Sequence, residues 1–371
     1  MSRLSVCTVT AVAALIAAMQ LPSTAAAQQQ LAAINRGVVE LETSGAAGIS
    51  VRIAEDLANL VDDGATRRVV PVVGKGSLQN LTDLKYLRGI DMAILQTDVL
   101  DYAKEQRLVP GLEWSLTYIT RLYNEEFHLL TGPGIKDVSE LANQKVNVDL
   151  RGSGTSITAA RLFEMLKIPV TFTNESQEVA LDKLHKGEIA ALAFVAGKPA
   201  PLFMSLKGDD GLHLLPVPFN ANASSGYAPA RLTAADYPGL VPPGGAVETI
   251  AVGSVLLVAD LRQLPERSRN IANFIDVFFT GFQSLLEPGH HPKWREVNLA
   301  GELPGWRRYP AAEQWLQRNM IASAPKPDDL RRMFASFIDE RRQAAGGPAM
   351  SQQEKDLVYK RFQTWQKGQA Q

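Results

Sequence analysis

The chain has 371 residues, of which 46% are hydrophobic and 21% are charged, and its formal net charge is -1. This composition is ordinary for a globular protein and excludes a disordered or fibrous chain. The balance of 38 basic against 39 acidic residues argues against nucleic acid as a partner, because no global positive field is available. One hydrophobic core rarely serves more than roughly 250 to 300 residues, so we expect two lobes.

The N-terminus has the layout of a secretory signal peptide. Arg3 precedes an apolar run over 6–19, and small residues follow up to Ala27. The apolar run is shorter than the roughly 20 residues that span a bilayer, so we expect cleavage after Ala27 and a periplasmic product. An uncleaved membrane anchor is the alternative. Since the single cysteine, Cys7, leaves with this segment, the mature chain is expected to have no disulfide or thiol chemistry.

A βαβαβ pattern follows the predicted signal peptide. An apolar strand over 38–43 precedes a helix over 49–61, in which apolar residues recur at helical spacing. A second strand over 69–73 leads into a helix over 77–87, and a buried strand over 90–95 completes the unit. Strands that alternate with helices in this way indicate a parallel sheet.

The same alternation returns further along the chain. A strand over 146–150 enters a helix over 155–166, and a strand over 169–173 enters a helix over 177–186. An apolar strand over 189–195 then completes this second unit. The repetition predicts two related α/β lobes.

Two segments are expected to cross between these lobes. The first is the extended aromatic and β-branched stretch over 114–124, and the second is a strand over 249–258 that rejoins the first lobe. The proline-rich segment over 216–243 is predicted to be irregular. Apolar residues at helical spacing over 271–282 predict amphipathic helices on the outside of the first lobe. The predicted organisation is a signal peptide over 1–27, the first part of lobe 1 over 28–120, lobe 2 over 121–245, and the return strand with C-terminal helices over 246–371.

The motifs of common enzyme classes are absent from the sequence. There is no Gly-x-Ser-x-Gly, no phosphate-binding Walker sequence and no third glycine after Gly152-Ser153-Gly154. The five histidines form no helical metal-binding pair. We therefore expect no catalytic residue, no metal site and no cofactor.

Four loops lie just beyond the carboxyl ends of predicted parallel strands, where open α/β sheets bind ligands. They offer hydroxyls, amides and unobstructed backbone N–H groups, and the last of them opens a helix whose unpaired amides favour an anion. Any one of these loops alone is more often a helix cap or a tight turn. Together they predict a carboxylate or phosphate site. The predicted ligand-binding residues in these loops are Thr43, Ser44, Gly45, Ala46, Ser77, Gln79, Gln96, Asp98, Gly152, Ser153, Gly154 and Thr155.

Side chains near the loops are further candidates for ligand contact. Arg151 and Lys198 would add positive charge, although a surface salt bridge is the commoner fate of either residue alone. Asp98 either contacts a ligand amine or caps the helix that begins there. Tyr227 and Tyr237 either stack on the ligand or pack as ordinary hinge aromatics.

The order of these motifs resembles the TRAP-associated extracytoplasmic immunogenic (TAXI) solute receptors. The resemblance covers most of the chain after the predicted signal peptide, and its segments include Gly76-Ser77-x-x-Asn80, Gly89–Asp98, Val146-Asn147-Val148, Gly152–Thr155, Gly197-Lys198-Pro199 and Tyr237-Pro238-Gly239. The resemblance implies an α/β type II periplasmic-binding-protein fold with a ligand cleft between two lobes. It also implies a monomeric, non-catalytic receptor that delivers a carboxylate, such as a dicarboxylate or an amino acid, to the membrane permease subunits of a TRAP-type transporter.

The sequence departs from the family pattern at two loops, and other classes of protein remain open. The first loop has Ala46-Ala47-Gly48 in place of paired glycines followed by tyrosines, and Arg151 precedes the later loop where the family often has an arginine after the threonine. A receptor for an ATP-driven importer and a sensor for a membrane kinase would use the same cleft. An extracytoplasmic enzyme with Asp98 and Asp149 as acid and base is the third alternative.

Overall fold

The computed structural model describes residues 36–45, 48–207, 211–219, 226–323, 335, 338, 350–351 and 353–360. The predicted signal peptide, its cleavage site and the candidate ligand residue Ala46 lie outside the described residues. The chain divides into one compact unit that ends at Ala312 and another that begins at Glu313. Within the described ranges, no helix is both long enough and apolar enough to cross a membrane.

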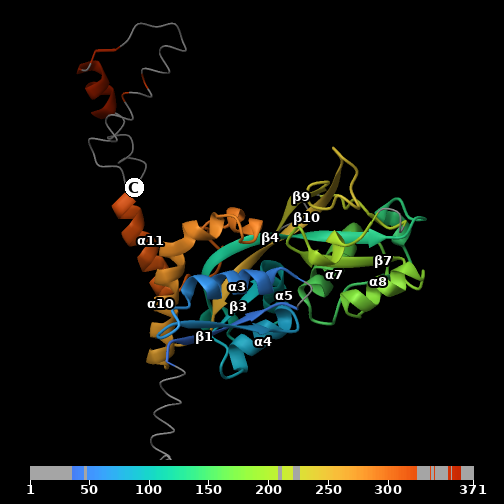
Figure 1. Ribbon diagram of the computed structural model, residues 1–371, viewed down its shortest axis with the longest axis horizontal. Coiled ribbons are helices and arrows are strands. Elements are labelled where there is room, and N and C mark those ends of the chain that lie inside the picture. Colours follow the sequence, from blue (N-terminus) through green and yellow to red (C-terminus); the bar gives the residue numbers. More distant parts are fainter. Residues whose placement is uncertain are drawn as a thin grey trace, which may run out of the picture. The chain divides into compact units, whose positions relative to one another are not determined.

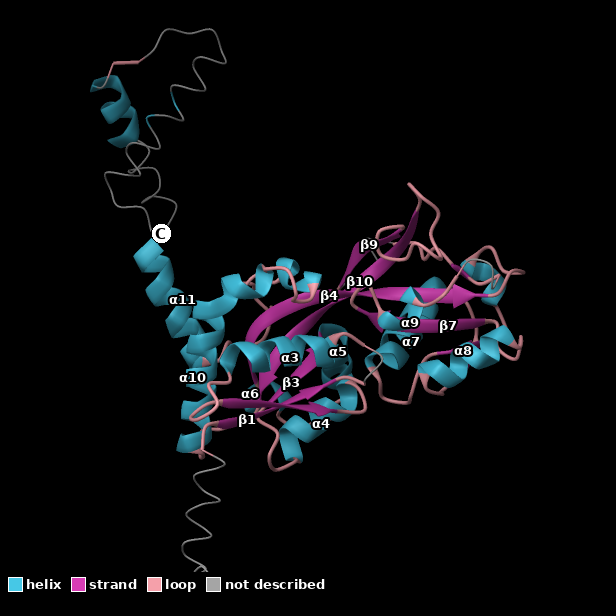
Figure 2. Cartoon of the chain, viewed as in Figure 1, coloured by secondary structure: helices cyan, strands magenta, loops and turns pink. Residues whose placement is uncertain are grey.

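The first lobe has the predicted alternation of strands and helices (Figure 1). β1 pairs in parallel with β2 on one side and with β3 on the other. Figure 2 shows α3, α4 and α5 around these strands. In chain order the elements are β1 (Val38–Thr43), α3 (Ser50–Val61), β2 (Arg68–Val73), α4 (Ser77–Tyr86), β3 (Met92–Gln96), α5 (Thr97–Glu105) and α6 (Leu112–Ser115).

The second lobe repeats the pattern, and β5 pairs in parallel with β6 and β7. β5 ends earlier than predicted, because Asp149 and Gly152 both have the left-handed backbone conformation that turns the chain out of the sheet. The elements are η1 (Val138–Leu141), β5 (Lys145–Asn147), α7 (Gly154–Leu166), β6 (Thr171–Thr173), α8 (Gln177–His185), β7 (Ala191–Ala196), α9 (Pro201–Met204) and β8 (His213–Leu214).

Two long antiparallel strands, β4 (Thr117–Thr131) and β10 (Ala246–Val258), pass through both lobes. The second half of β10 pairs with β3 in the first lobe, whereas the second half of β4 pairs with β7 in the second lobe. The main path of the sheet therefore has the order β2-β1-β3-β10-β4-β7-β5-β6. Both predicted crossing segments are strands that unite the lobes in one sheet, but the first begins later and ends later than predicted, because Trp114 and Ser115 belong to α6 and β4 continues to Thr131.

The prediction that the proline-rich segment is irregular is wrong for part of its length. Residues Tyr227–Thr233 form β9, which pairs antiparallel with the first half of β10. Pro229 lies opposite Ile250 in this pair. Among the described residues, β9 pairs with no strand other than β10, so its outer edge is free. A proline is tolerated on such an edge strand, because no neighbouring strand there needs its backbone N–H as a donor.

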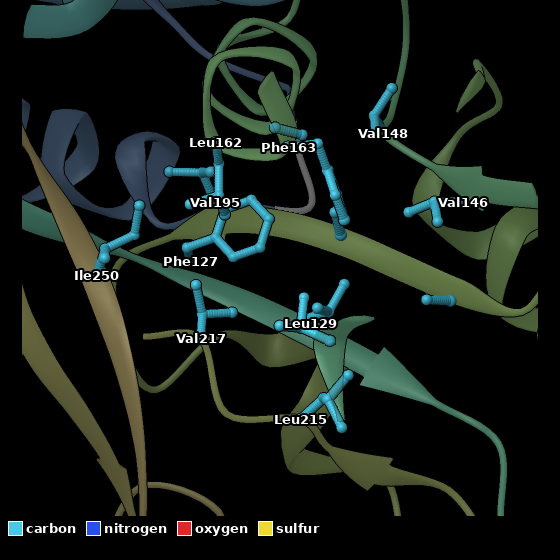
Figure 3. Close-up of a cluster of buried hydrophobic side chains, with 14 of the residues drawn as sticks. Phe127, Leu129, Val146, Val148, Leu162, Phe163, Val195, Leu215, Val217 and Ile250 are labelled. Carbon is cyan, nitrogen blue, oxygen red and sulfur yellow. The ribbon is translucent and has the colours of Figure 1, made fainter. Parts of the chain in front are cut away.

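The second lobe has a core in which α7 packs on the sheet. Leu162 and Phe163 of α7 contact a cluster that includes Phe127 of β4, Val195 of β7 and Ile250 of β10 (Figure 3). All of these side chains are buried. The start of α7 is therefore held in a fixed position relative to both crossing strands.

The C-terminal part of the first compact unit contains the predicted amphipathic helix. α10 (Pro265–Gly281) buries Ile271, Phe274 and Phe278, as the helical spacing predicts. Two short 3-10 helices follow, η3 (Phe282–Leu286) and η4 (Pro292–Glu296). α11 (Pro310–Ser323) spans the division between the two units, and residues 353–360 of the second unit are helical.

Substitutions on α7 test this packing. Leu162→Ala, at a fully buried position, is expected to lower the free energy of unfolding by roughly 2–5 kcal/mol, because it removes apolar contacts and leaves a cavity. Glu164→Ala, at an exposed position of the same helix, is the control and is expected to change it by less than about 0.5 kcal/mol. Urea titration measures both values, and equal values for the two variants would contradict the packing.

Candidate functional site

A cavity of about 280 Å³ lies between the two lobes. It is bordered by the residues that follow β1, β2, β3 and β5 at their carboxyl ends, where open α/β sheets bind ligands. The predicted ligand residues that line it are Ser44, Gly45 and Ser77 with Gln96 from the first lobe, and Ser153, Gly154 and Thr155 from the second. The structure therefore brings these loops together around one cavity.

Several other predicted residues do not line this cavity. Thr43 is buried, and its hydroxyl donates to the carbonyl oxygen of Ser44. Gln79 is exposed on α4, and Arg151 is exposed at the turn before α7. Lys198 donates to the carboxylate of Asp236 at 3.0 Å. It therefore forms a salt bridge, the alternative to ligand contact that the sequence left open.

Asp98 joins the two lobes. Its Oδ2 accepts hydrogen bonds from the hydroxyls of Thr158 on α7, at 2.6 Å, and Tyr227 on β9, at 2.9 Å. Its burial raises the pKa of the carboxyl group. On the same two helices, Arg161 of α7 donates to both carboxylate oxygens of Glu105 of α5, at 2.8 and 3.1 Å. These contacts hold α5 of the first lobe against α7 of the second.

A second cavity, of about 510 Å³, borders this contact between α5 and α7. Gly152 and Tyr227 line it, together with Glu105 and Arg161. The predicted residues Gly152 and Tyr227 therefore lie at a different cavity from the other loop residues. The carbonyl oxygen of Gly152 accepts a hydrogen bond of 3.1 Å from the backbone N–H of Leu78, which is a further contact between the lobes.

Glycine at two positions permits the close approach of the lobes. A Cβ atom at Gly76 would lie 2.7 Å from the Cα of Ser153 in the other lobe, and one at Gly154 would lie 1.6 Å from Oε1 of Gln96. Both distances are far below van der Waals contact. Any side chain at either position would therefore force the lobes or the Gln96 side chain to move.

The start of α7 presents hydrogen-bond donors to the cavity. The hydroxyl of Ser153 accepts from the N–H of Ser156 at 3.1 Å, whereas the N–H groups of Gly154 and Thr155 have no hydrogen-bond partner among the described residues. The hydroxyl oxygen of Thr155 accepts from the N–H of Val195, which leaves its hydrogen free to donate. These donors and the helix dipole favour a negatively charged group.

Acceptors also line the cavity, and the sequence reasoning missed the principal one. Glu125 of β4 is 6% exposed, and its Oε2 accepts from Nε2 of Gln96. Burial raises the pKa of the Glu125 carboxyl to about 7. The signal in the sequence is Glu125-Glu126, two acids within an apolar crossing segment.

The charged side chains around the cavity are mostly acidic. Asp149 and Glu178 line it along with Glu125, and Lys75 is the only cationic side chain on its lining among the described residues. No group of three His, Cys, Asp or Glu side chains in the described ranges could hold a metal ion. The cavity thus combines anion-favouring donors at the start of α7 with carboxylates on other elements.

The predicted two-lobe α/β architecture, with a cavity between the lobes, is confirmed. The chain belongs to the NMT1-like family, whose model matches residues 41–266. That range includes every strand of both lobes except the first part of β1.

Similar solved structures include three binding proteins. The alkanesulfonate-binding protein SsuA from Xanthomonas axonopodis pv. citri, bound to MOPS, is 14% identical with a TM-score of 0.43, over 76% of this chain and 83% of that one. The periplasmic binding protein BugD is 10% identical with a TM-score of 0.45, over 77% and 94%. The ligand-binding component of an ABC-type import system from Staphylococcus aureus is 12% identical with a TM-score of 0.41, over 79% and 95%.

The raised pKa of Glu125 predicts a pH-dependent contribution to stability. A folded-state pKa of about 7, above the unfolded value near 4.5, means that the protonated carboxyl favours the folded state at low pH. This contribution is lost as the pH rises through 7. The free energy of unfolding of the wild type, minus that of Glu125→Gln, is therefore expected to fall between about pH 4.5 and pH 8.

Urea titrations of both proteins across this pH range measure the difference. Subtracting the variant from the wild type removes the contributions of Glu40 and Glu42, whose carboxyl pKa values are also raised to about 7. Glu164→Gln, an exposed acid on α7, controls for the loss of one carboxylate. A difference that rises with pH for Glu125→Gln would contradict the account.

Proposed function

We propose that the protein is an extracytoplasmic solute-binding receptor that captures a small organic solute between its lobes and releases it to a membrane transporter. The observation that carries the proposal is the cavity of about 280 Å³, which loops from both lobes line. A solute that contacts both lobes binds the closed state more tightly than the open state, so its binding shifts the protein toward the closed state. No catalytic step is part of this function.

The proposed solute is an organic anion with a carboxylate at the start of α7. The free N–H groups of Gly154 and Thr155 and the dipole of α7 support this choice, as does the hydroxyl of Thr155. Ser44, Ser77 and Gln96 are the proposed contacts from the first lobe, because they line the same cavity. Thr43, Gln79, Arg151 and Lys198 have no proposed contact with the solute.

The proposed motion is a rotation about the crossing strands. The ladder between β4 and β10 has register shifts between Gly253 and Val255 and between Leu256 and Leu257. Such irregularities interrupt the regular hydrogen bonding of a sheet and allow it to bend locally. The hydrogen bonds from Thr158 and Tyr227 to Asp98 and the ion pair of Arg161 with Glu105 would then act as contacts of the closed state.

The proposed partner is the permease of a TRAP-type transporter, which follows from the resemblance to the TAXI receptors. The same cavity would serve the binding protein of an ATP-driven importer or a ligand sensor for a membrane kinase. The proposed location is the periplasm, after cleavage of the predicted signal peptide. Co-purification of the protein with a TRAP-type permease, an ATP-driven importer or a membrane kinase, each in the presence and absence of solute, separates these partners.

A pair of glycine substitutions tests capture by closure. Gly76 and Gly89 both have a positive φ, 129° and 108°, but a Cβ at Gly89 would meet nothing within 4 Å. Both alanine variants therefore carry similar backbone strain, and only Gly76→Ala collides with the other lobe. Gly76→Ala is expected to weaken solute binding at least about tenfold, or about 1.4 kcal/mol, whereas Gly89→Ala retains it.

The measurement is calorimetric titration with a solute identified by a thermal-shift screen, together with small-angle scattering. The wild type and Gly89→Ala are expected to become more compact when the solute is added, and Gly76→Ala is not. If saturating solute leaves the wild-type radius of gyration unchanged, closure does not accompany binding. If no solute class binds at all, the receptor function itself is wrong.

A further inference from the structure

We propose that the solute held in this cavity carries a protonated amine, and that Glu125 is the residue that binds it. The inference rests on the proposed function and narrows it, because it adds an ammonium group, bound by Glu125, to the proposed carboxylate-bearing solute. Three features of the described residues support it: a buried carboxylate without an ion-pair partner, two buried amide oxygens without a hydrogen-bond donor, and the excess of acidic over basic side chains on the cavity lining.

The first feature is the contrast between Glu125 and its neighbour Glu126. Successive residues of a strand point to opposite faces of the sheet, so these two carboxylates meet different surroundings. Glu126 accepts a hydrogen bond of 2.6 Å from the ammonium of Lys293, which is also buried. Glu125 faces the cavity and forms no ion pair among the described residues. A buried carboxylate without a cationic partner is costly, and an ammonium group from the solute would supply the missing positive charge.

The second feature is the pair of amide oxygens of Gln96 and Gln177. Both side chains are at least 95% buried and line the cavity, and Oε1 of each has no hydrogen-bond partner among the described residues. Their Nε2 atoms are already used, since Gln96 donates to Glu125 and Gln177 donates to the carbonyl oxygen of Ala193. Both oxygens can therefore accept a hydrogen bond from a solute. An ammonium group has three N–H donors on one nitrogen and can donate to several acceptors at once.

The third feature is the charge of the lining. Glu125, Asp149 and Glu178 are acidic, and Lys75, at an exposed position, is the only basic side chain on the lining within the described ranges. This arrangement disfavours a second carboxylate on the solute and favours a cation. The start of α7 supplies anion-favouring donors on the other side of the cavity. A solute with one carboxylate and one ammonium group satisfies both sides of the cavity.

Three probes with the same four-carbon chain and different end charges test the inference. They are 4-aminobutanoate, butane-1,4-diamine and succinate, and calorimetric titration at about pH 8 keeps Glu125 ionised, above its pKa of about 7. Further amines, amino acids and carboxylates of similar size are titrated as well, so that each combination of end charges is represented by several solutes. Solutes with one carboxylate and one ammonium group, such as 4-aminobutanoate, are expected to bind the wild type at least about tenfold more tightly than dicarboxylates of the same length.

Glu125→Gln provides the residue-specific readout. This variant keeps the size of the side chain and is expected to weaken binding of ammonium-bearing solutes at least about tenfold, without weakening binding of dicarboxylates. Glu164→Gln, which removes an exposed carboxylate on α7, is the matched control and retains wild-type binding of every probe. Circular dichroism and urea titration establish that both variants are folded.

The outcomes separate this inference from the proposed function. If dicarboxylates or neutral solutes bind and compact the protein while ammonium-bearing solutes do not, the inference is overturned and the receptor function stands. Equal binding of ammonium-bearing solutes by the wild type and Glu125→Gln also overturns it. If no solute of any charge class binds or compacts the wild type, the receptor function and the inference fail together.

Discussion

The antiparallel pairing of β4 with β10 determines how the two lobes are joined. These two strands pair with β3 in one lobe and with β7 in the other, so they connect two parallel βαβ units into one sheet. Each unit places its loops at the carboxyl ends of its own strands. The crossing strands bring the two sets of loops to face each other, and the cavity exists because of that arrangement.

The same strands give the cavity its chemical character. The alternation of side chains along β4 directs Glu126 to the buried Lys293 and Glu125 to the cavity. A shift of one residue in the register of β4 would exchange these environments. The core of the second lobe, in which Phe127 of β4 contacts α7, fixes the start of that helix beside the cavity. The register of β4 therefore determines both which of its side chains pack in the core and which of its charged side chains faces the cavity.

Local patterns in the sequence predicted much of the fold. The alternation of apolar runs with helical periodicity identified the strands and helices of both lobes, and the glycine and hydroxyl residues at the strand ends identified most of the loops at the cavity. Local patterns did not predict the single continuous sheet or β9, because strand pairing between distant segments depends on tertiary contacts. Pro229 favoured an irregular segment, and only its position on an edge strand makes it compatible with β9.

The sequence was less informative about individual side chains at the site. Glu125 lies within a strand rather than a loop, and its exposure to the cavity depends on the register of β4. Asp98 contacts Thr158 and Tyr227, residues 60 and 129 positions away, which no local pattern predicts. Lys198 forms an ion pair with Asp236 instead of lining the cavity, and no local pattern brings these two residues together.

A crystal structure of the protein with a bound solute would show whether one solute is held between the two lobes, in the cavity lined by Glu125 and the start of α7. We expect solute atoms within hydrogen-bond distance of Gly154 or Thr155 in the second lobe, and of Ser44, Ser77 or Gln96 in the first. A solute that contacts only one lobe, or that binds outside this cavity, would contradict it.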